Sequence, residues 1–406
     1  MCRARAPAPP PERCRTVIEP RVAAHAGRLA PGQLPAYVHD LAALDRDARV
    51  IRAALPERVE LYYAVKANPA PEILRALAPH VHGYEVSSGG ELTHVRRVVP
   101  GSPLAFGGPG KTEEELRLAL ELGVERVHVE SAHELRLLGA LARAPLDLLL
   151  RVNLPVPDGH MDRAALAMGG RPTPFGLDPD GAASCLPLPG GGRVRLRGIH
   201  AHLASGLDAR AQVAVARHIT TWAGEFAGRH GFDLAEVNVG GGMAVDYASP
   251  HARFDWQAYG RGLRGLLSGH EGLTLRAEPG RSVTAYGGWY VTDVLDIKHS
   301  HGEAFAVLRG GTHHMRTPAA RGHDHPFTVL PMEGWPRARP RPAVHREPVT
   351  LVGQLCTPRD VFARRIEVTA LRAGDRVAFA MAGAYAWNIS HHDFLMHPPP
   401  TFHYLE

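Results

Sequence analysis

The sequence predicts an α/β fold in which a (β/α)8 TIM barrel is followed by a mainly β C-terminal domain. From about residue 59, eight short apolar runs alternate with segments whose apolar residues recur three and four positions apart, as in amphipathic helices. After Pro279 the strand-like runs continue without such helices. Eight units over about 225 residues match a barrel in number and length, whereas a doubly wound open sheet usually has fewer units.

Each expected barrel strand is a short apolar run bounded by turn residues. In chain order, these strands cover residues 59–65, 83–86, 104–107, 126–130, 146–153, 196–203, 236–239 and 273–277. The helical spacing is clearest at residues 111–122, 132–142 and 209–229.

The C-terminal part is expected to be mainly β because its apolar runs are strand-like. Its expected strands cover residues 281–298, 304–308, 328–331, 349–352, 366–371 and 375–379, with a surface loop rich in proline and arginine at 334–346. A strand at 36–39 is expected to join this β domain. The predicted domains are a disordered or extended arm at 1–34, a barrel at 35–280 from which 35–45 can join the β domain, and a β domain at 281–406. Prolines in about the first fifteen residues favour disorder there.

Composition excludes several classes of function. Lys and Arg exceed the acidic residues by only five and are scattered, so no nucleic-acid partner is expected. No apolar run approaches the roughly 20 residues that a membrane helix needs, and the N-terminal segment lacks the apolar core of a secretory signal. The four cysteines form neither a disulfide framework nor a zinc spacing, which predicts a reduced, cytoplasmic protein.

Lysine is rare in this chain and occurs only at positions 66, 111 and 298. Lys66 follows the first barrel strand in the run YYAVKAN, and active sites lie at the carboxyl ends of barrel strands. A guanidinium does not lose its proton to become a nucleophilic amine, so arginine cannot replace a Schiff-base lysine. Lys66 is therefore a candidate catalytic residue, whereas Lys111 and Lys298 carry no such argument.

Glycines, an arginine and histidines follow three further barrel strands. The triplet 240–242 follows the seventh strand, and Arg281 closes the run EPGR after the eighth. Glycine N–H groups can approach a phosphate closely, and arginine adds a bidentate partner. The sixth strand ends in HAHLASG, where a spacing of two places His200 and His202 on one side. Since no carboxylate or cysteine cluster at the other strand ends completes a ligand set, no metal is expected.

In chain order, the runs YYAVKAN, GYEVSSGGEL, HAHLASG, GGG, EPGR, GQLCTPRD and GAYAWN resemble those of the fold-type III pyridoxal-phosphate decarboxylases. That group includes the diaminopimelate, ornithine and arginine decarboxylases and is related to alanine racemase. The resemblance covers nearly all of the chain after about residue 35. It implies an alanine racemase-like barrel, a pyridoxal 5'-phosphate cofactor and removal of the α-carboxylate of an amino-acid substrate.

The resemblance also implies roles for matching residues. Lys66 would bind the cofactor covalently, and Glu85, where the family often has aspartate, would lie near the cofactor ring. His202 would stack on that ring, and Glu278 would pair with the pyridine nitrogen. The residues that would hold the phosphate are Ser205, Gly240, Gly241, Gly242, Gly280 and Arg281. Tyr385 would reach the phosphate or the aldimine face of the cofactor.

Active sites shared across a homodimer are a further implication of the resemblance. Cys356 would come from the second subunit and return a proton to the α-carbon, a task that suits a thiol because its pKa can be tuned near the working pH. Without the surrounding run, a free cysteine is most often a small buried hydrophobic residue.

The residues after the expected strand at 304–308 depart from the familiar subfamilies. Basic-amine and diaminopimelate decarboxylases resemble one another in carrying an acid there, whereas RGGTHHMRTP contains none. A distal ammonium would meet repulsion in this loop, and carboxylates would be attracted. The expected substrate-binding residues are Arg309, His313, His314 and Arg316.

The runs GGTHHMRTP, LCTPRD and SHHDFLMHPPP most resemble the decarboxylases of carboxylate-siderophore pathways. Those enzymes act on an amino acid already attached to citrate, as in staphyloferrin B, achromobactin or vibrioferrin assembly. A second departure is Pro174-Phe175-Gly176, where the family usually has lysine in the first position.

Several alternatives remain open. One is a diaminopimelate or other D-amino-acid decarboxylase with an unusual pocket, and another is a non-enzymatic pyridoxal-phosphate carrier. The carrier is disfavoured because it would need neither the run around Cys356 nor a second domain. The histidines at 313 and 314 could also only line a surface loop.

Overall fold

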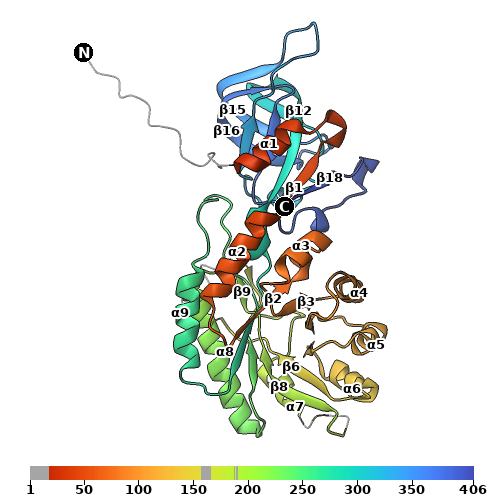
Figure 1. Cartoon of the computed structure of the whole chain (residues 1–406), viewed down its shortest axis with the longest axis vertical. Coiled ribbons are helices and arrows are strands. Elements are labelled where there is room, and N and C mark those ends of the chain that lie inside the picture. The colour runs from red at the N-terminus through yellow and green to blue at the C-terminus, as the bar shows by residue number, and fades with distance from the viewer. Residues whose placement is uncertain (1–17, 157–165, 187, 189–190) are drawn as a thin grey trace, which may run out of the picture. The chain divides into compact units, whose positions relative to one another are not determined.

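The computed structural model describes residues 18–156, 166–186, 188 and 191–406. The chain forms two compact units (Figure 1). The barrel unit comprises Leu41–Val245 and Arg253–Thr284, and the β unit comprises the described part of Met1–Asp40 together with Asp246–Ala252 and Ala285–Glu406. The short segment Asp246–Ala252, expected within the barrel, thus groups with the β unit.

Eight parallel strands close the barrel unit into a ring, which confirms the predicted fold. In spatial order around the ring they are β2 (Val59–Ala64), β3 (Gly83–Val86), β4 (Leu104–Phe106), β5 (Arg126–Val129), β6 (Leu146–Arg151), β8 (Val194–His200), β10 (Glu236–Asn238) and β11 (Thr274–Ala277). Each lies within or overlaps a strand predicted from the sequence. A two-stranded antiparallel sheet of β7 (Leu166–Ala167) and β9 (Ala204–Ser205) was not predicted.

Helices surround the ring, as Figure 1 shows. They are α2 (Leu41–Ala54), α3 (Pro71–Leu77), α4 (Gly89–Val98), α5 (Glu113–Glu121), α6 (Ala132–Leu141), α7 (Pro179–Ser184), α8 (Ala209–His230), α9 (Trp256–Leu267) and α10 (Arg281–Thr284), with one 3-10 turn, η3 (Val65–Ala67). Side chains define where several helices begin: Ser88, Ser131 and Asp208 each accept a hydrogen bond from a backbone N–H in the first turn. The helices expected at 111–122, 132–142 and 209–229 are α5, α6 and α8.

The β unit contains an eight-stranded sheet. Its strands are β1 (Ala36–Asp40), β12 (Gly288–Ser300), β13 (Glu303–Leu308), β14 (Phe327–Leu330), β15 (Ala343–Val352), β16 (Val361–Arg372), β17 (Arg376–Phe379) and β18 (Thr401–Leu405). Its short helices are α1 (Pro20–Arg28), η2 (Pro31–Gln33), η5 (Ala285–Gly287), α11 (Thr317–Arg321), η6 (Trp387–Ile389) and η7 (Phe394–Met396). Strand β1 pairs antiparallel with β12 and parallel with β18, so the N-terminal strand does join this domain.

Two sequence-based expectations for the β unit were wrong in detail. The predicted strand at 281–298 begins with the helical turns α10 and η5, and β12 starts only at Gly288. A Cβ at Gly288 would lie 2.5 Å from Cα of Gly383, so this crossing requires glycine. The loop expected at 334–346 ends where β15 begins at Ala343.

The N-terminal arm is not uniformly extended, because residues 20–28 form α1. The helix buries Val22 and Ala26. The guanidinium of Arg376, on β17, donates to the carbonyl oxygens of Ala26 and Leu29 at the carboxyl end of this helix, where backbone oxygens lack helical partners. Disorder of the first fifteen residues falls outside the described residues.

The interior of the barrel is polar at one level. Arg276 on β11 is fully buried, and its guanidinium contacts the carboxylates of Glu60 at 2.6 Å, Glu236 at 3.4 Å and Glu125 at 3.5 Å. It also lies over the ring of Tyr62, 3.9 Å from the ring centre. Because a buried charge is tolerated only when it is paired, Arg276 neutralises acids from several different strands and their connections.

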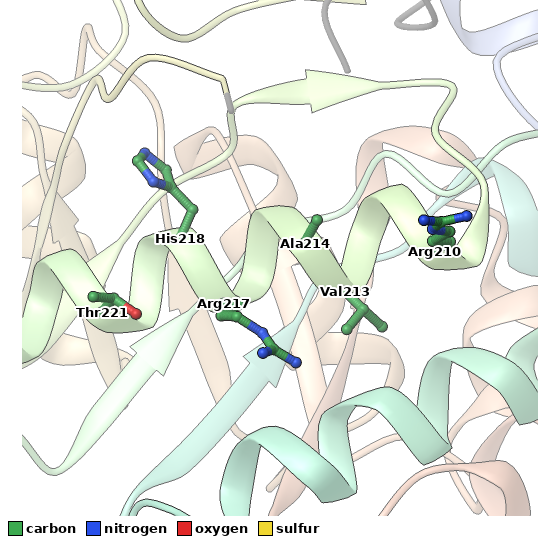
Figure 2. Close-up of a pocket in the computed structure, with 6 residues that line it drawn as sticks. All are labelled: Arg210, Val213, Ala214, Arg217, His218 and Thr221. Carbon is green, nitrogen blue, oxygen red and sulfur yellow. The ribbon is translucent and has the colours of Figure 1, made fainter. Parts of the chain in front are cut away.

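An open groove runs along one face of α8 and is shown in Figure 2. Its volume is about 470 Å3, and it is lined by Arg210, Val213, Ala214, Arg217, His218 and Thr221. These positions recur three and four residues apart along a single helix, and none of them is a site residue predicted from the sequence. Among the described residues, no helix combines the length and apolar character needed to cross a bilayer.

The Arg276 network predicts a large loss of stability when its cation is removed. Arg276→Met leaves the buried carboxylate of Glu236 and the partly exposed carboxylates of Glu60 and Glu125 without their shared partner, so we expect the free energy of unfolding to fall by about 3–5 kcal/mol in urea denaturation. Arg117→Met is the matched control because Arg117 pairs with Glu113 on an exposed helix face, where an ion pair contributes little. Equal losses in the two variants would contradict this role of Arg276.

Candidate active site

Lys66 lies in η3, directly after β2, and its amine contacts the carboxylate of Glu85 on β3. The two residues meet because β2 and β3 are neighbours and Ala64 is paired with Glu85. Glu85 is buried and also accepts a hydrogen bond from Ser87 Oγ at 3.0 Å. The structure thus brings together two residues that the sequence placed in one site.

The glycine triplet 240–242 leaves no room for side chains. A Cβ at its first position would lie 2.6 Å from Nδ1 of His202, and at its second 2.3 Å from the carbonyl oxygen of Glu278. At its third position a Cβ would lie 2.2 Å from the carbonyl oxygen of Ala204. The first and third glycines also have φ values of +68° and +93°, which favour glycine. The triplet therefore holds backbone against the ends of β8 and β11.

His202 is oriented by two contacts in the barrel mouth. Its Nδ1 accepts a hydrogen bond from the backbone N–H of Gly241 at 3.0 Å, and its Nε2 lies 3.3 Å from Ser205 Oγ. Because Nδ1 is an acceptor, the neutral ring carries its proton on Nε2 and donates it to Ser205. Burial, with smaller contributions from Arg151 and Lys66, lowers the pKa of His202 to about 3, so the ring is neutral near pH 7.

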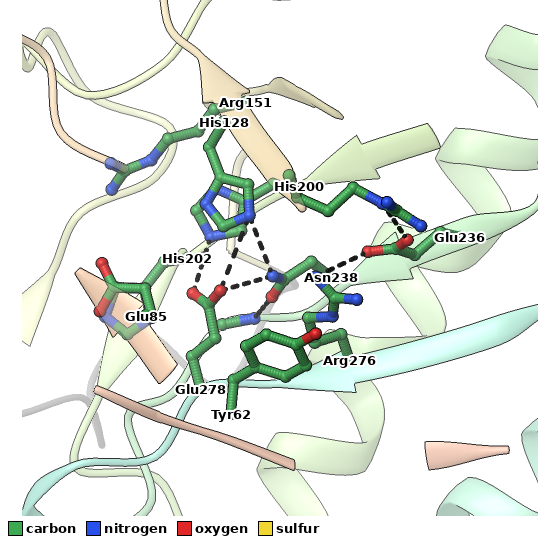
Figure 3. A network of polar contacts seen from close by, with 12 residues as sticks. Tyr62, Glu85, His128, Arg151, His200, His202, Glu236, Asn238, Arg276 and Glu278 are labelled. Carbon is green, nitrogen blue, oxygen red and sulfur yellow. Dashed lines mark hydrogen bonds and ion pairs between the residues drawn. The ribbon is translucent and has the colours of Figure 1, made fainter. Parts of the chain in front are cut away.

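Glu278 is the centre of a buried polar cluster at the end of β11 (Figure 3). One carboxylate oxygen accepts a hydrogen bond from Asn238 Nδ2 at 2.6 Å and lies 3.7 Å from Nε2 of His128. The other lies 3.5 Å from Nε2 of His200. The two imidazole rings stack with their centres 4.2 Å apart. Glu278 is thus held by groups from three other strands.

The geometry corrects one expectation about metal ligands. No carboxylate was expected to join the histidines of the sixth strand, yet His200, Glu278 and His128 have ligand atoms within 4.8 Å of one another. These three groups could hold a metal ion. The absence of a metal stays a prediction.

Gly280 and Arg281 follow β11 beside the turn that carries Lys66. A Cβ at Gly280 would lie 2.8 Å from Cβ of Ala67, so glycine allows the two loops to pack closely. Arg281 begins α10. The loops after the first and eighth strands therefore meet at the mouth of the barrel, with Lys66 and Arg281 on its rim.

Sequence analysis missed His128 and Asn238, although a signal for them was present. Barrel strands alternate between inward and outward side chains, and polar residues recur at every second position in Arg126–Val129 and Glu236–Asn238. In strands buried on both faces, such polar residues point to an internal network rather than to solvent.

The role of Lys111 was also not predicted from the sequence. In the structure this lysine holds backbone segments together. Its side chain is 1% exposed, and its ammonium contacts a carboxylate oxygen of Glu134 at 2.7 Å. The same ammonium donates to the carbonyl oxygens of Gly108 at 2.6 Å and His128 at 2.9 Å. Three acceptors match the three donors of an ammonium group. Lys111 therefore anchors the backbone of His128.

The segment Pro174-Phe175-Gly176, which lacks the family's usual lysine, is held by a different cation. Arg151 lies over the ring of Phe175 at 5.0 Å and pairs with Glu130 at 2.6 Å. Glu130 in turn accepts a hydrogen bond from the backbone N–H of Gly176 at 3.0 Å. An arginine on β6 thus contacts the segment where the lysine is missing.

The remaining predicted residues belong to the β unit. Cys356 is exposed, and Tyr385 has a φ of +48°, a conformation that is uncommon for a residue with a side chain. Arg309 forms two hydrogen bonds with the carboxylate of Asp293, at 2.7 and 3.1 Å. The backbone N–H of Arg316 donates to Ser390 Oγ at 3.0 Å.

Asp360 organises the two loops of the β unit that carry these residues. One of its oxygens accepts from the N–H of Thr312 at 2.7 Å, and the other accepts from the N–H of Leu355 at 2.9 Å. A Cβ at Gly353 would lie 2.3 Å from the same carboxylate, so glycine is required there. The carboxylate joins the loop after β13 to the loop of Cys356, and it too was missed from the sequence.

Comparison with known proteins identifies relatives of the whole fold. Residues 41–285 match the model of the pyridoxal-dependent decarboxylase family, pyridoxal binding domain. A protein of Staphylococcus aureus named 2-[(L-alanin-3-ylcarbamoyl)methyl]-2-hydroxybutanedioate decarboxylase is 41% identical, covering 91% of this chain and 93% of its own. A diaminopimelate decarboxylase of Actinosynnema pretiosum is 33% identical, covering 86% of this chain and 79% of its own.

Among solved structures, diaminopimelate decarboxylase of Helicobacter pylori, in a mutant form complexed with L-lysine, superposes with a TM-score of 0.79. The two sequences are 25% identical, and the match covers 92% of this chain and 91% of the other. This match extends over the barrel and the β domain alike.

The cluster around Glu278 predicts that acid destabilises the barrel. Burial holds the pKa values of His128 and His200 well below the ordinary imidazole value, so both rings are neutral in the fold. The unfolded rings gain protons below about pH 6.5, so stability that is complete above that pH is lost as the pH falls. Each ring contributes a slope of about 1.4 kcal/mol per pH unit.

His128→Asn should therefore reduce the slope of unfolding free energy against pH by about one proton, measured by urea denaturation between about pH 5 and 7. His299→Asn, at an exposed histidine of β12, controls for the loss of any imidazole. An unchanged slope in His128→Asn would show that this ring does not titrate as a buried neutral group.

Proposed function

Because this chain belongs to the pyridoxal-dependent decarboxylase family, and is therefore a pyridoxal-phosphate enzyme that removes a carboxylate, we propose that its substrate is an amino acid joined to citrate or a similar hydroxy-polycarboxylate. The proposal includes a place in carboxylate-siderophore biosynthesis. The observation that carries it is the loop after β13, which has histidines and arginines and no acid between residues 309 and 318. A substrate with extra carboxylates fits such a loop.

The barrel mouth has the groups that a pyridoxal phosphate needs. A glycine triplet that excludes every Cβ, together with Ser205 and Arg281, offers a place for a phosphate. The amine of Lys66 lies beside an acid at the rim, and the Glu278 carboxylate lies buried within the mouth. The chemistry of this donor set therefore fits the cofactor.

When bound, the cofactor supplies an electron sink for the electron pair left on the α-carbon as carbon dioxide departs. In our proposal, Glu278 holds a proton at the pyridine nitrogen, and neutral His128 and His200 lie against its carboxylate while Asn238 donates to it. His202 presents a neutral ring face, which its contacts with Gly241 and Ser205 hold in place. Lys66 would hold the cofactor through its amine.

Phosphate binding is assigned to Ser205, the triplet 240–242 and Arg281, with Gly280 allowing the loop of Arg281 to pack closely against the loop of Lys66. Tyr385 is also proposed to contact the bound cofactor. The strained φ of this tyrosine supports a positional role, since such conformations cluster at functional sites.

Cys356 is proposed to act across a homodimer, delivering a proton to the α-carbon in the other subunit's site. The segment 389–402 supports an interface, because five large apolar side chains there are exposed. Their exposed fractions are 39% for Ile389, 41% for Phe394, 44% for Leu395, 92% for Met396 and 40% for Phe402. Such side chains gain most when a second subunit covers them.

The name of the Staphylococcus aureus relative supports the substrate class, since it describes alanine linked through a carbamoylmethyl group to hydroxybutanedioate. The second candidate is diaminopimelate, because the Actinosynnema relative is named for that substrate. The acid-free loop favours the first candidate. A cytoplasmic location also stays a prediction.

Release of carbon dioxide from competing substrates tests the proposed function. We expect the holoenzyme to act on a citryl-diaminopropionate conjugate at least about a hundredfold better, in kcat/KM, than on meso-diaminopimelate, ornithine or lysine, since a site with unpaired polar groups discriminates strongly. Lys66→Ala should release none and lose the visible absorption of bound cofactor, whereas Lys298→Ala, at an exposed lysine of β12, should retain both. Preference for free diaminopimelate would overturn the substrate assignment.

Subunit mixing tests the shared site. Lys66→Ala and Cys356→Ala should each be nearly inactive alone. If each site combines Lys66 of one subunit with Cys356 of the other, randomly mixed dimers recover about one quarter of the wild-type sites, because half of the dimers carry one intact site. Activity of the mixture no greater than that of the separate variants would place both residues in one subunit's site.

A further inference from the structure

Five histidines gather in the β unit around the loop that follows β13. His313 and His314 belong to that loop, and their ring centres are 3.9 Å apart. His397, from the C-terminal segment, lies 5.2 Å from His313. The other two members are His391 and His392, whose positive charges would act on His313. Two segments far apart in the sequence thus contribute to one cluster.

Two of the residues expected to bind substrate already have protein partners. His314 Nδ1 lies 3.0 Å from Tyr290 Oη, and its Nε2 lies 3.1 Å from the carbonyl oxygen of Pro398. The guanidinium of Arg309 is paired with Asp293 through two hydrogen bonds. These contacts hold the loop in place and leave the two side chains less able to bind a ligand.

His313 differs from its neighbour. Its side chain is fully buried, and neither ring nitrogen has a hydrogen-bond partner within the described part of the chain. An unpaired buried polar group costs free energy unless a ligand or water satisfies it. Such a group at the centre of a histidine cluster indicates a site that a polar ligand completes.

The protonation of His397 follows from its neighbours. The amide oxygen of Gln354 accepts from the N–H of Gly310 at 2.7 Å, so the amide nitrogen of Gln354 faces His397 Nδ1, 3.1 Å away. This nitrogen donates to Nδ1, and the neutral His397 ring therefore carries its proton on Nε2. Nε2 is thus a hydrogen-bond donor.

We propose that His313, His397 and His391, with Arg316 beside them, form a binding subsite for the distal carboxylates of the substrate. The proposal rests on the proposed function and narrows it to particular residues. The backbone N–H of Arg316 donates to Oγ of Ser390 at 3.0 Å, and Ser390 directly precedes His391 in the chain. Two acids contact this loop, and both already have partners: Asp293 is paired with Arg309, and Asp360 accepts hydrogen bonds from backbone N–H groups.

The subsite adjoins the proposed proton donor. Gln354, which orients His397, lies two residues before Cys356, and its backbone N–H donates to the carbonyl oxygen of Gly310 at 2.8 Å. One loop therefore connects carboxylate recognition with the residue proposed to protonate the product.

The test compares two substrates that share a reacting centre. The holoenzyme is assayed with the citryl-diaminopropionate conjugate and with free diaminopropionate, and citrate alone serves as a binding probe by calorimetry. We expect His397→Gln and His313→Gln to reduce the preference for the conjugate, as a ratio of kcat/KM values, by about tenfold or more, as loss of a hydrogen bond to a charged group does. Citrate affinity should fall in parallel. His345→Gln, at an exposed histidine of β15, should change neither quantity.

The outcomes separate this proposal from the proposed function. If the conjugate is a good substrate and both variants keep the preference and the citrate affinity of the wild type, the subsite is wrong and the function stands. If the conjugate is not a substrate but the variants lose citrate affinity, the subsite stands and the function is wrong. His397→Gln keeps the test valid if His313→Gln fails to fold, because His397 is only partly buried.

Discussion

The barrel depends on pairing charges in an interior that water does not fill. β11 carries Arg276 and, just beyond its last residue, Glu278, and the neighbouring β10 carries Glu236 and Asn238, of which Asn238 lies opposite Arg276. Arg276 neutralises acids at one level, and the carboxylate of Glu278 is held by Asn238 and two neutral imidazoles at the next. The partners of Arg276 and Glu278 come from different strands and their connections. These buried polar groups therefore become paired only when the strands close into a ring. The proposed cofactor site is built on the second of these levels.

Lysine has two distinct uses in a chain that otherwise relies on arginine. Lys66 lies at the rim, half exposed, where an amine that can lose its proton has chemical value. Lys111 is buried, and its three donors are directed to one carboxylate and two carbonyl oxygens, a pattern that a planar guanidinium would not match. Since one of those carbonyls belongs to His128, the second lysine positions a side chain that contacts Glu278. Both lysines stood out in the sequence because lysine is rare in this chain. Only for Lys66 did its position in the sequence also suggest a chemical role.

In the β unit, side-chain contacts to the backbone join two loops. Asp360 and the glycines beside it hold the loop after β13 against the loop of Cys356, and Gln354 links the same loops through both its side chain and its backbone. His313 and His314 were both expected from the sequence to bind substrate, but the structure gives them different surroundings. His314 stabilises the loop, whereas the neighbouring His313 has no hydrogen-bond partner among the described residues. Chemical type alone does not distinguish these two adjacent histidines.

The sequence by itself determined the fold class, the order of the barrel strands, and the candidacy of Lys66 and of the glycine triplet. The inferences about the fold were confirmed because periodicity is a local property. The candidacy of Lys66 and of the triplet stays a prediction, based on the fact that neither a deprotonatable amine nor a missing Cβ can be replaced by another residue type. Only the tertiary structure decided which histidines meet Glu278, that Lys111 anchors His128, that α1 is a helix held by Arg376, and that Arg309 is paired with Asp293. Each of these depends on residues brought together from distant parts of the chain, and no local pattern records which partner a buried polar group will find when the sheet closes.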